Sequence, residues 1–145
     1  MSQAAIDQVM ARLPREEGVK KFAYNDATGK QVTCKPGGNL SIGEGINLEW
    51  GLEPEEIDFL SRNRITKLDA QLQAYPWYSA ASDPRQSVFL DVAFNDGLEG
   101  LMHFPHMLSA AAANDWDDAT EELAVADKSL DASRYAPLRA ILKAG

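Results

Sequence analysis

Two acidic residues near the start of the chain have types and positions suited to glycoside hydrolysis. Glu17 follows a helix-forming stretch and precedes Gly18, and Asp26 comes nine positions later in a turn-forming stretch. This chemistry needs two carboxyl groups: one donates a proton to the leaving oxygen, and the other activates water or attacks from the opposite side of the sugar. The spacing alone leaves open a plainer interpretation, in which Glu17 is a solvated helix-end acid and Asp26 an ordinary turn residue.

The first of these acids follows a predicted helix. Apolar side chains recur at helical spacing within residues 3–13, at Ile6, Val9, Met10 and Leu13. Pro14 comes next, and because proline has no backbone N–H to donate, we expect it to interrupt this helix.

The second acid lies in a segment of different character. Residues 25–51 are rich in glycine, which excludes a helix there. The short runs at 31–33 and 39–42 predict two or three strands joined by turns.

Beyond Gly51 the pattern is helical. Pro54, with Glu55 and Glu56 after it, suits the first turn of a long amphipathic helix. Asp83-Pro84 gives the same signal before an apolar stretch that predicts a buried central helix. Further helices are expected near residues 104–113, 115–126 and 135–143, with Asp115 as the N-cap of the second.

These elements predict an α+β fold in a single domain, residues 1–145. A small strand-rich lobe, about 18–52, is inserted between the N-terminal helix and a larger helical lobe, about 53–145. Two such lobes would leave a cleft in which a polymer could lie.

Composition excludes several classes of partner. The net charge is −8, which disfavours nucleic acid because phosphate binding needs clustered Lys and Arg. No apolar run reaches the roughly 20 residues of a membrane span, and the N-terminus lacks the layout of a secretory signal. Cys34 is the only cysteine, so no internal disulfide forms, and with His103 and His106 it gives no zinc-ligand spacing.

The order of the motifs is more specific than any one of them. The chain carries Glu16-Glu17-Gly18, then Tyr24-Asn25-Asp26, then Ser41-Ile42-Gly43-Glu44-Gly45, and later Ala93-Phe94-Asn95-Asp96-Gly97. This order resembles the glycoside hydrolase family 24 lysozymes of bacteriophages, which carry acid-Glu-Gly, Tyr-x-Asp, Thr-Ile-Gly-x-Gly and Ala-Phe-Asn-x-Gly. The Glu-to-Asp interval of nine is the family's own, and the likeness covers roughly residues 6–126.

The resemblance implies a lysozyme-like fold and a role for each matched residue. Glu17 would be the general acid, with a pKa raised so that it stays protonated near neutrality. Asp26 would remain ionised and position water or stabilise positive charge, and Ser41 would hold the water in place of the family's threonine. Phe94 and Asn95 would line the floor of the cleft and Asn47 its upper wall. No cofactor or metal is implied.

The chain departs from the family pattern at several positions. Fifteen positions separate Asp26 from Ser41, about twice the family interval, so Thr33 is a rival for the hydroxyl role. Ile46 stands where members carry His or Arg, and Pro14 where the family helix is uninterrupted. The tail 124–139 lacks the family's Trp-x-x-Gln.

Other chemically notable residues have plain structural interpretations. Tyr75, Trp77 and Tyr78 could stack on sugars, but a place in the core or between helices is favoured. Glu44, between two glycines, is interpreted as an exposed loop charge. His103 and His106 are expected at the surface or at a helix start, and Cys34 is expected to be inert.

The resemblance therefore predicts a muramidase that cleaves peptidoglycan between N-acetylmuramic acid and N-acetylglucosamine, and that acts as a monomer. As a phage lytic enzyme made in the host cytoplasm, it would reach the periplasmic cell wall through a holin-like pore or be carried in the virion. Two alternatives stay open: a lytic transglycosylase acting on the same bond, and a lysozyme-fold protein that binds glycan or a partner without cleaving.

Overall fold

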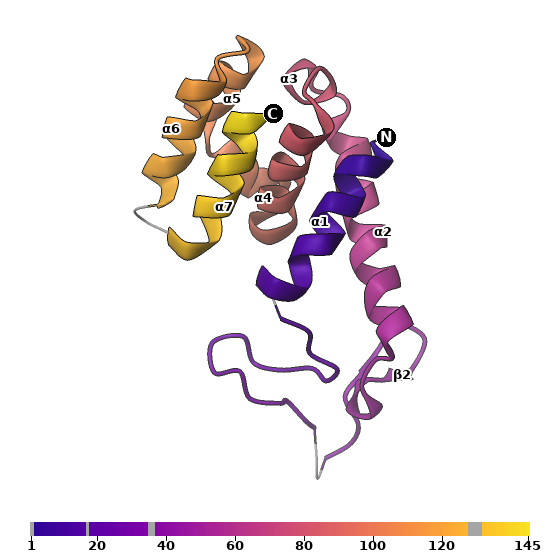
Figure 1. The fold of residues 1–145 in the computed structure, drawn as a ribbon. Coiled ribbons are helices and arrows are strands. Elements are labelled where there is room, and N and C mark those ends of the chain that lie inside the picture. Colours follow the sequence, from indigo (N-terminus) through magenta and orange to yellow (C-terminus); the bar gives the residue numbers. More distant parts are fainter. Residues whose placement is uncertain (1, 17, 35–36, 128–131) are drawn as a thin grey trace.

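The computed structural model describes residues 2–16, 18–34, 37–127 and 132–145 (Figure 1). In these residues the chain is mostly helical with a small antiparallel sheet, as the predicted α+β class requires. The α-helices are α1 Gln3–Glu16, α2 Pro54–Leu72, α3 Pro76–Ser79, α4 Asp83–Met102, α5 Pro105–Ala112, α6 Trp116–Asp127 and α7 Ala132–Ala144. The strands are β1 Ser41–Ile42 and β2 Ile46–Asn47, followed by the 3-10 helix η1 Leu48–Trp50.

Helix α4 forms the centre of the core. Every residue from 86 to 93 is buried, and α4 contacts α1, α2, α3 and α7. The prediction of a buried central helix is thus confirmed. The helix breaks at Gly97, whose φ of 77° lies outside the helical region, so the last residues of α4 start a new direction.

Helix α1 packs on α4 through its predicted apolar stripe, since Ile6, Val9 and Leu13 are buried. The prediction that Pro14 interrupts this helix is wrong, because α1 continues to Glu16. Pro14 lies within the last turn, where its missing N–H costs a single helical hydrogen bond, to the carbonyl of Met10.

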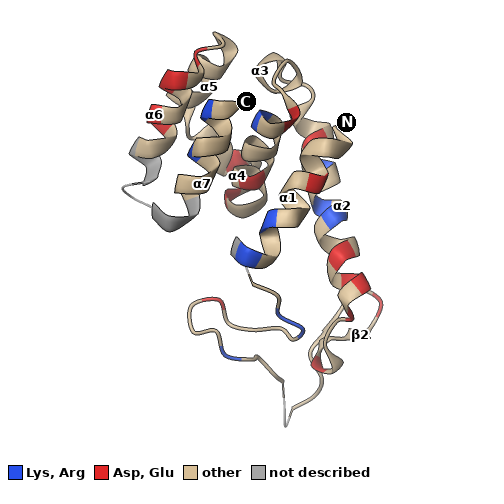
Figure 2. Cartoon of the chain, viewed as in Figure 1, with Lys and Arg blue, Asp and Glu red and all other residues tan. Residues whose placement is uncertain are grey.

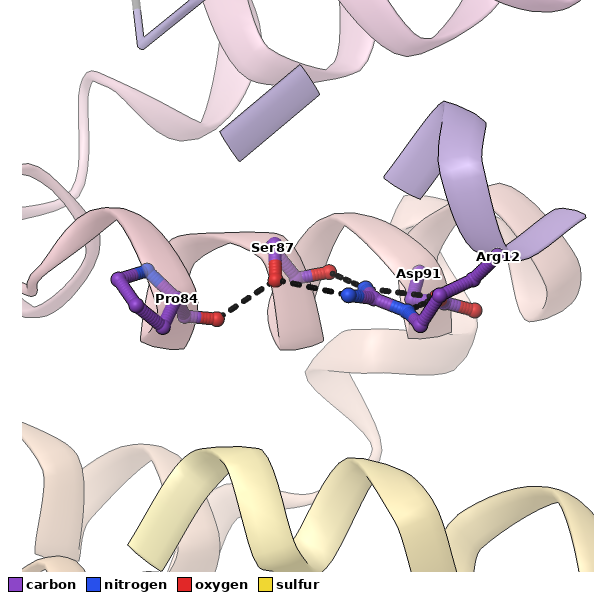
Figure 3. Close-up of polar contacts among 4 residues, drawn as sticks. All are labelled: Arg12, Pro84, Ser87 and Asp91. Atoms are coloured by element: carbon purple, nitrogen blue, oxygen red, sulfur yellow. Dashed lines mark hydrogen bonds and ion pairs between the residues drawn. The ribbon is translucent and has the colours of Figure 1, made fainter. Parts of the chain in front are cut away.

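An ion pair is buried between α1 and α4 (Figure 3). Nη2 of Arg12 lies 2.9 Å from Oδ2 of Asp91, and the two side chains are 9% and 0% exposed. Arg12 also donates to Ser87, through Nη1 to the hydroxyl (3.2 Å) and through Nη2 to the backbone carbonyl (3.0 Å). The Ser87 hydroxyl donates in turn to the carbonyl of Pro84 (2.7 Å). These partners satisfy the guanidinium away from water.

Helices α1 and α2 are joined on their exposed sides. Nη1 of Arg62 lies 2.7 Å from Oδ1 of Asp7, and Nε of Arg62 lies 3.6 Å from Oδ2 of Asp58. The hydrogen bond from Arg62 holds the pKa of the Asp7 carboxyl below its usual value.

The segment between α1 and α2 projects from the helices as a separate lobe (Figure 1). It is less regular than predicted. Besides β1 and β2, its described residues contain one isolated bridge, between Tyr24 and Gln31, so the expected strand at 31–33 does not form. No described residue from 18 to 64 is buried. Without a core face to bury, alternating side chains gain little from strand pairing.

Two further predictions, the N-cap of α6 and the place of the aromatic group near Tyr78, are confirmed. Oδ1 of Asp115 accepts a hydrogen bond from the backbone N–H of Asp118 (3.1 Å) and caps α6 as expected. Tyr78 is fully buried, and the Trp77 and Phe89 rings are 5.1 Å apart, so this aromatic group belongs to the core. Among the described residues, no helix is both long and apolar enough to cross a membrane.

Candidate functional site

A groove of about 590 Å³ lies between the end of α1 and the start of α2. Its walls come from five parts of the chain: the last turns of α1, the residues that follow it, the residues before α2, the first two turns of α2, and one residue of α4. The lining residues are Met10, Leu13, Pro14, Gly18, Val19, Lys21, Leu52, Glu53, Pro54, Ile57, Asp58, Ser61 and Phe94.

The groove adjoins the motif that carries the predicted general acid. Glu17 lies outside the described residues. Pro14 and Gly18, on either side of it in the sequence, both line the groove. Gly18 has a φ of 69°, the left-handed conformation with which glycine commonly ends a helix. This explains the glycine of the acid-Glu-Gly motif, because other residues adopt that backbone only at a cost.

One wall of the groove is fixed where the chain before α2 meets the chain after α1. The backbone N–H of Leu52 donates to the carbonyl of Lys21 (2.8 Å), and Nζ of Lys21 lies 3.1 Å from Oε1 of Glu53. Gly51 permits this approach. Its φ is 77°, and a Cβ placed on it would lie 2.5 Å from Cγ of Lys21.

Charge is distributed unevenly around the groove. Acidic residues concentrate in the first turns of α2 (Figure 2), which contain Glu55, Glu56 and Asp58 after Glu53. The groove itself combines apolar side chains such as Ile57 with the polar groups of Lys21, Glu53, Asp58 and Ser61. A mainly apolar lining with a few polar groups is typical of small-molecule sites.

Asp26 lies in an exposed hairpin, outside the groove wall. The hairpin closes through backbone hydrogen bonds from Asn25 to Lys30 (2.8 Å) and from Val32 to Ala23 (2.9 Å). The side chain of Asn25 accepts from the N–H of Thr28 (3.1 Å) and so stabilises the turn in which Asp26 lies.

Ser41 and Asn47 are brought opposite each other by the β1–β2 pairing. Ser41 is exposed, whereas Asn47 is half-buried and its Oδ1 accepts from the N–H of Glu49 (2.9 Å). Neither lines the main groove. Asn47 lines a second, smaller hollow of about 360 Å³. Thr33, the rival for the hydroxyl role, is exposed. The turn joining β1 and β2 carries Glu44 as an exposed charge, as predicted.

The two predicted residues of α4 differ in position. Phe94 is half-buried and lines the groove, while its neighbour Asn95 is exposed and off the groove wall. Of the six predicted site residues, the groove therefore includes Phe94. Its lining does not include Asp26, Ser41, Asn47 or Asn95, and Glu17 lies outside the described residues.

Three charged residues that shape this site were not predicted from the sequence. Glu53 and Asp58 line the groove, and Arg12 fixes α1 against α4. Arg12 had a detectable signal, because it shares the helical face of Ala5 and Val9, and Asp91 interrupts an apolar stretch. A charge at a core position on each of two helices predicts a buried ion pair.

The described part of the chain contains no group of three or more His, Cys, Asp or Glu side chains placed to hold a metal ion.

Comparison of the chain with protein-family models, with curated proteins and with solved structures finds no match.

Proposed function

We propose that this chain is a peptidoglycan muramidase, which hydrolyses the β-1,4 bond between N-acetylmuramic acid and N-acetylglucosamine. The observation that carries the proposal is the position of the groove. Pro14 and Gly18, three positions before Glu17 and one after it, line the groove, and so does Phe94 of the Ala-Phe-Asn-x-Gly motif. Two motifs about 75 residues apart in the sequence, which the family resemblance assigns to one site, thus adjoin a single groove.

In the proposed reaction Glu17 donates its proton to the glycosidic oxygen as the bond to the anomeric carbon breaks. Asp26, ionised, takes a proton from the attacking water or stabilises the positive charge that develops on the sugar. Ser41 holds that water. The two carboxyl groups must lie on either side of the same glycosidic bond. Because Asp26 and Ser41 lie outside the groove wall, the mechanism requires the hairpin and β1 to reach the bond that Glu17 protonates once glycan is bound.

The biological setting that fits this activity is phage lysis. The enzyme would act on the periplasmic cell wall, released through a holin-like pore or delivered with the virion. We expect it to work as a monomer and without a cofactor, since two carboxyl groups suffice for the reaction.

One observation favours a second candidate, a lytic transglycosylase. Asp26 does not line the groove. A transglycosylase needs a single catalytic acid, because the 6-hydroxyl of the muramic acid attacks the anomeric carbon in place of water. Its product would therefore carry a 1,6-anhydro end rather than a reducing end.

The test is clearance of outer-membrane-permeabilised bacteria by the wild type, Glu17→Gln and Asp26→Asn, with Glu44→Gln as the matched control. Glu44 is an exposed acid of the same lobe, between Gly43 and Gly45. The wild type and Glu44→Gln should clear the suspension, and Glu17→Gln should not.

The products and the Asp26→Asn variant separate the candidates. Reducing ends together with an inactive Asp26→Asn support the hydrolase, whereas anhydro ends together with an active Asp26→Asn support the transglycosylase. A wild type that clears nothing between pH 5 and 8 at low salt overturns both, and leaves a non-cleaving glycan-binding protein as the alternative.

A further inference from the structure

The side chain of Trp50 is held outward at the end of η1. It is 79% exposed, more than any other large hydrophobic side chain in the described residues. A single exposed apolar side chain is ordinary, but the exposed Ile46 lines the same hollow as Trp50. Exposed apolar side chains gathered at a hollow point to a binding surface.

Backbone contacts fix the turn that presents Trp50. The N–H of Leu48 donates to the carbonyl of Leu40 (2.8 Å), and the N–H of Gly51 donates to the carbonyl of Leu48 (3.1 Å). Oε1 of Glu49 accepts from the N–H of Cys34 (3.1 Å). The turn is therefore tied to two other parts of the lobe, and these contacts define the backbone position from which Trp50 projects.

Beside Trp50 lies the second hollow, of about 360 Å³. This volume is at the lower end of small-molecule sites, which measure roughly 300–1,000 Å³. Asn47, Glu53 and Glu56 contribute polar groups to it, and Ile46 a further apolar side chain. The Asn47 side chain keeps its Nδ2 group without a hydrogen-bond partner among the described residues, while its Oδ1 caps η1.

The geometry points to an accessory glycan subsite at Trp50, which binds an N-acetylhexosamine unit of the same strand that occupies the main groove. A pyranose ring has one apolar face of C–H groups, which an indole can cover, and equatorial hydroxyl and amide groups, which Asn47 and the two carboxylates can bind. Glu53 lines both the main groove and this hollow, so the two adjoin at this residue, as the inference requires.

Charge argues for a neutral sugar over anionic partners. Glu53, Glu55 and Glu56 surround the start of α2, and the whole chain carries a net charge of −8. A phosphate backbone or an anionic lipid surface would be repelled from this face. The inference rests on the proposed function for the identity of the glycan, but binding at Trp50 does not require cleavage.

The test measures binding by the full-length chain carrying Glu17→Gln, so that no strand is cut during titration. The probes are the hexamer and the dimer of N-acetylglucosamine, peptidoglycan strands freed of stem peptides, and the free stem peptide. Binding is followed by calorimetry and by the shift in tryptophan fluorescence. The variants are Trp50→Ala and Trp50→Tyr, with Phe59→Ala as the matched control because Phe59 is 66% exposed but does not line the hollow.

We expect Trp50→Ala to raise the Kd for the hexamer and for the strands by about tenfold or more, since an aromatic anchor dominates such contacts. Trp50→Tyr should restore part of the affinity, and Phe59→Ala should bind as the parent does. Equal affinity in the parent and Trp50→Ala, or binding of the stem peptide in place of the sugars, overturns the inference.

The wild-type activity assay separates this inference from the proposed function. If the wild type cleaves cell walls but Trp50→Ala binds normally, the subsite fails and the muramidase stands. If the wild type does not cleave but binds glycan through Trp50, the muramidase fails and the subsite stands. If glycan neither binds nor is cleaved, both fail.

Discussion

Arg12 of α1 and Asp91 of α4 form a buried ion pair four residues before α1 ends, with 2.9 Å between Nη2 and Oδ2. The pair fixes the C-terminal part of α1 against the most buried helix of the fold (Figure 3). The groove begins there, since Met10, Leu13 and Pro14 line it. The wall that α1 gives to the groove therefore depends on a contact at the edge of the core.

Removing one partner of this pair should destabilise the protein strongly. Asp91→Asn removes the buried carboxylate that pairs with the guanidinium of Arg12, and removing one partner of a buried pair costs about 3–5 kcal/mol of unfolding free energy. The double variant Arg12→Met/Asp91→Leu removes both charges and should be much closer to the wild type. Urea unfolding followed by circular dichroism gives both values.

Asp7→Asn is the matched control, because it removes an ion-pair partner from α1 at an exposed position and should have little effect. An Asp91→Asn variant that unfolds like Asp7→Asn would show that the buried pair does not stabilise the α1–α4 contact.

A second prediction concerns alkaline stability. The hydroxyl of Tyr78 is buried and donates to Oδ1 of Asp69 (2.7 Å). Burial, the hydrogen bond to Asp69 and the charge of Asp69 all raise the pKa of Tyr78 far above its usual value. The folded state therefore keeps this proton at a pH where the unfolded chain loses it, above about pH 10. The stabilisation is complete below that pH and declines as pH rises further.

Tyr78→Phe should lower the unfolding free energy at neutral pH by about 1–3 kcal/mol, because Asp69 loses a buried partner. The variant should also lose less stability than the wild type between about pH 9.5 and 11. Urea unfolding across that range measures the difference, with Tyr24→Phe as the control at an exposed hairpin position. Parallel pH profiles for the wild type and Tyr78→Phe would contradict the prediction.

The sequence predicted helices well and the lobe between them poorly, for a physical reason. A helix that packs in the core, such as α4, has apolar side chains that reveal it in the sequence, and residues 86–93 are all buried as expected. The segment from 18 to 52 buries no described side chain, so its local pattern had no core to select strands. Hydrogen bonds such as Leu52 to Lys21 shape it instead, and these do not appear in side-chain patterns.

The site was predicted in part for a similar reason. Phe94 belongs to α4, whose burial can be predicted from its apolar sequence, and it lines the groove. Glu53 and Asp58 reach the groove because α2 begins beside the end of α1. That proximity is a property of the tertiary arrangement, and a single sequence does not encode it in any local motif.

A third prediction compares two glycines that differ in backbone conformation and in surroundings. Gly29 and Gly51 both have positive φ, 65° and 77°, so alanine at either position should strain the backbone, by about 1–2 kcal/mol at Gly29. The strain should be larger at Gly51, because its ψ of 179° places it in a region that essentially only glycine adopts. At Gly29 the added Cβ meets nothing within 4 Å, whereas at Gly51 it would lie 2.5 Å from Cγ and 3.0 Å from the carbonyl oxygen of Lys21. Gly51→Ala should therefore be the less stable variant.

The variants Gly51→Ala and Gly29→Ala also test whether the hydrogen bond between Leu52 and Lys21 holds the groove wall. Amide hydrogen exchange at Leu52 should accelerate in Gly51→Ala, because the carbonyl of Lys21 that accepts its N–H must move. In Gly29→Ala the Leu52 amide should exchange as in the wild type. Equal exchange in the two variants would mean that Lys21 accommodates the methyl group without opening the wall.

The fourth prediction tests what begins α6. Oδ1 of Asp115 accepts from the N–H of Asp118, so Asp115→Ala should lower the unfolding free energy by about 1 kcal/mol. Asp115→Asn keeps a hydrogen-bond acceptor and loses only the charge at the positive end of the helix dipole. Its unfolding free energy should therefore fall by less than that of Asp115→Ala. Asp118→Ala keeps the backbone donor and serves as the control. If Asp115→Asn were as unstable as Asp115→Ala, charge rather than the hydrogen bond would stabilise the start of α6.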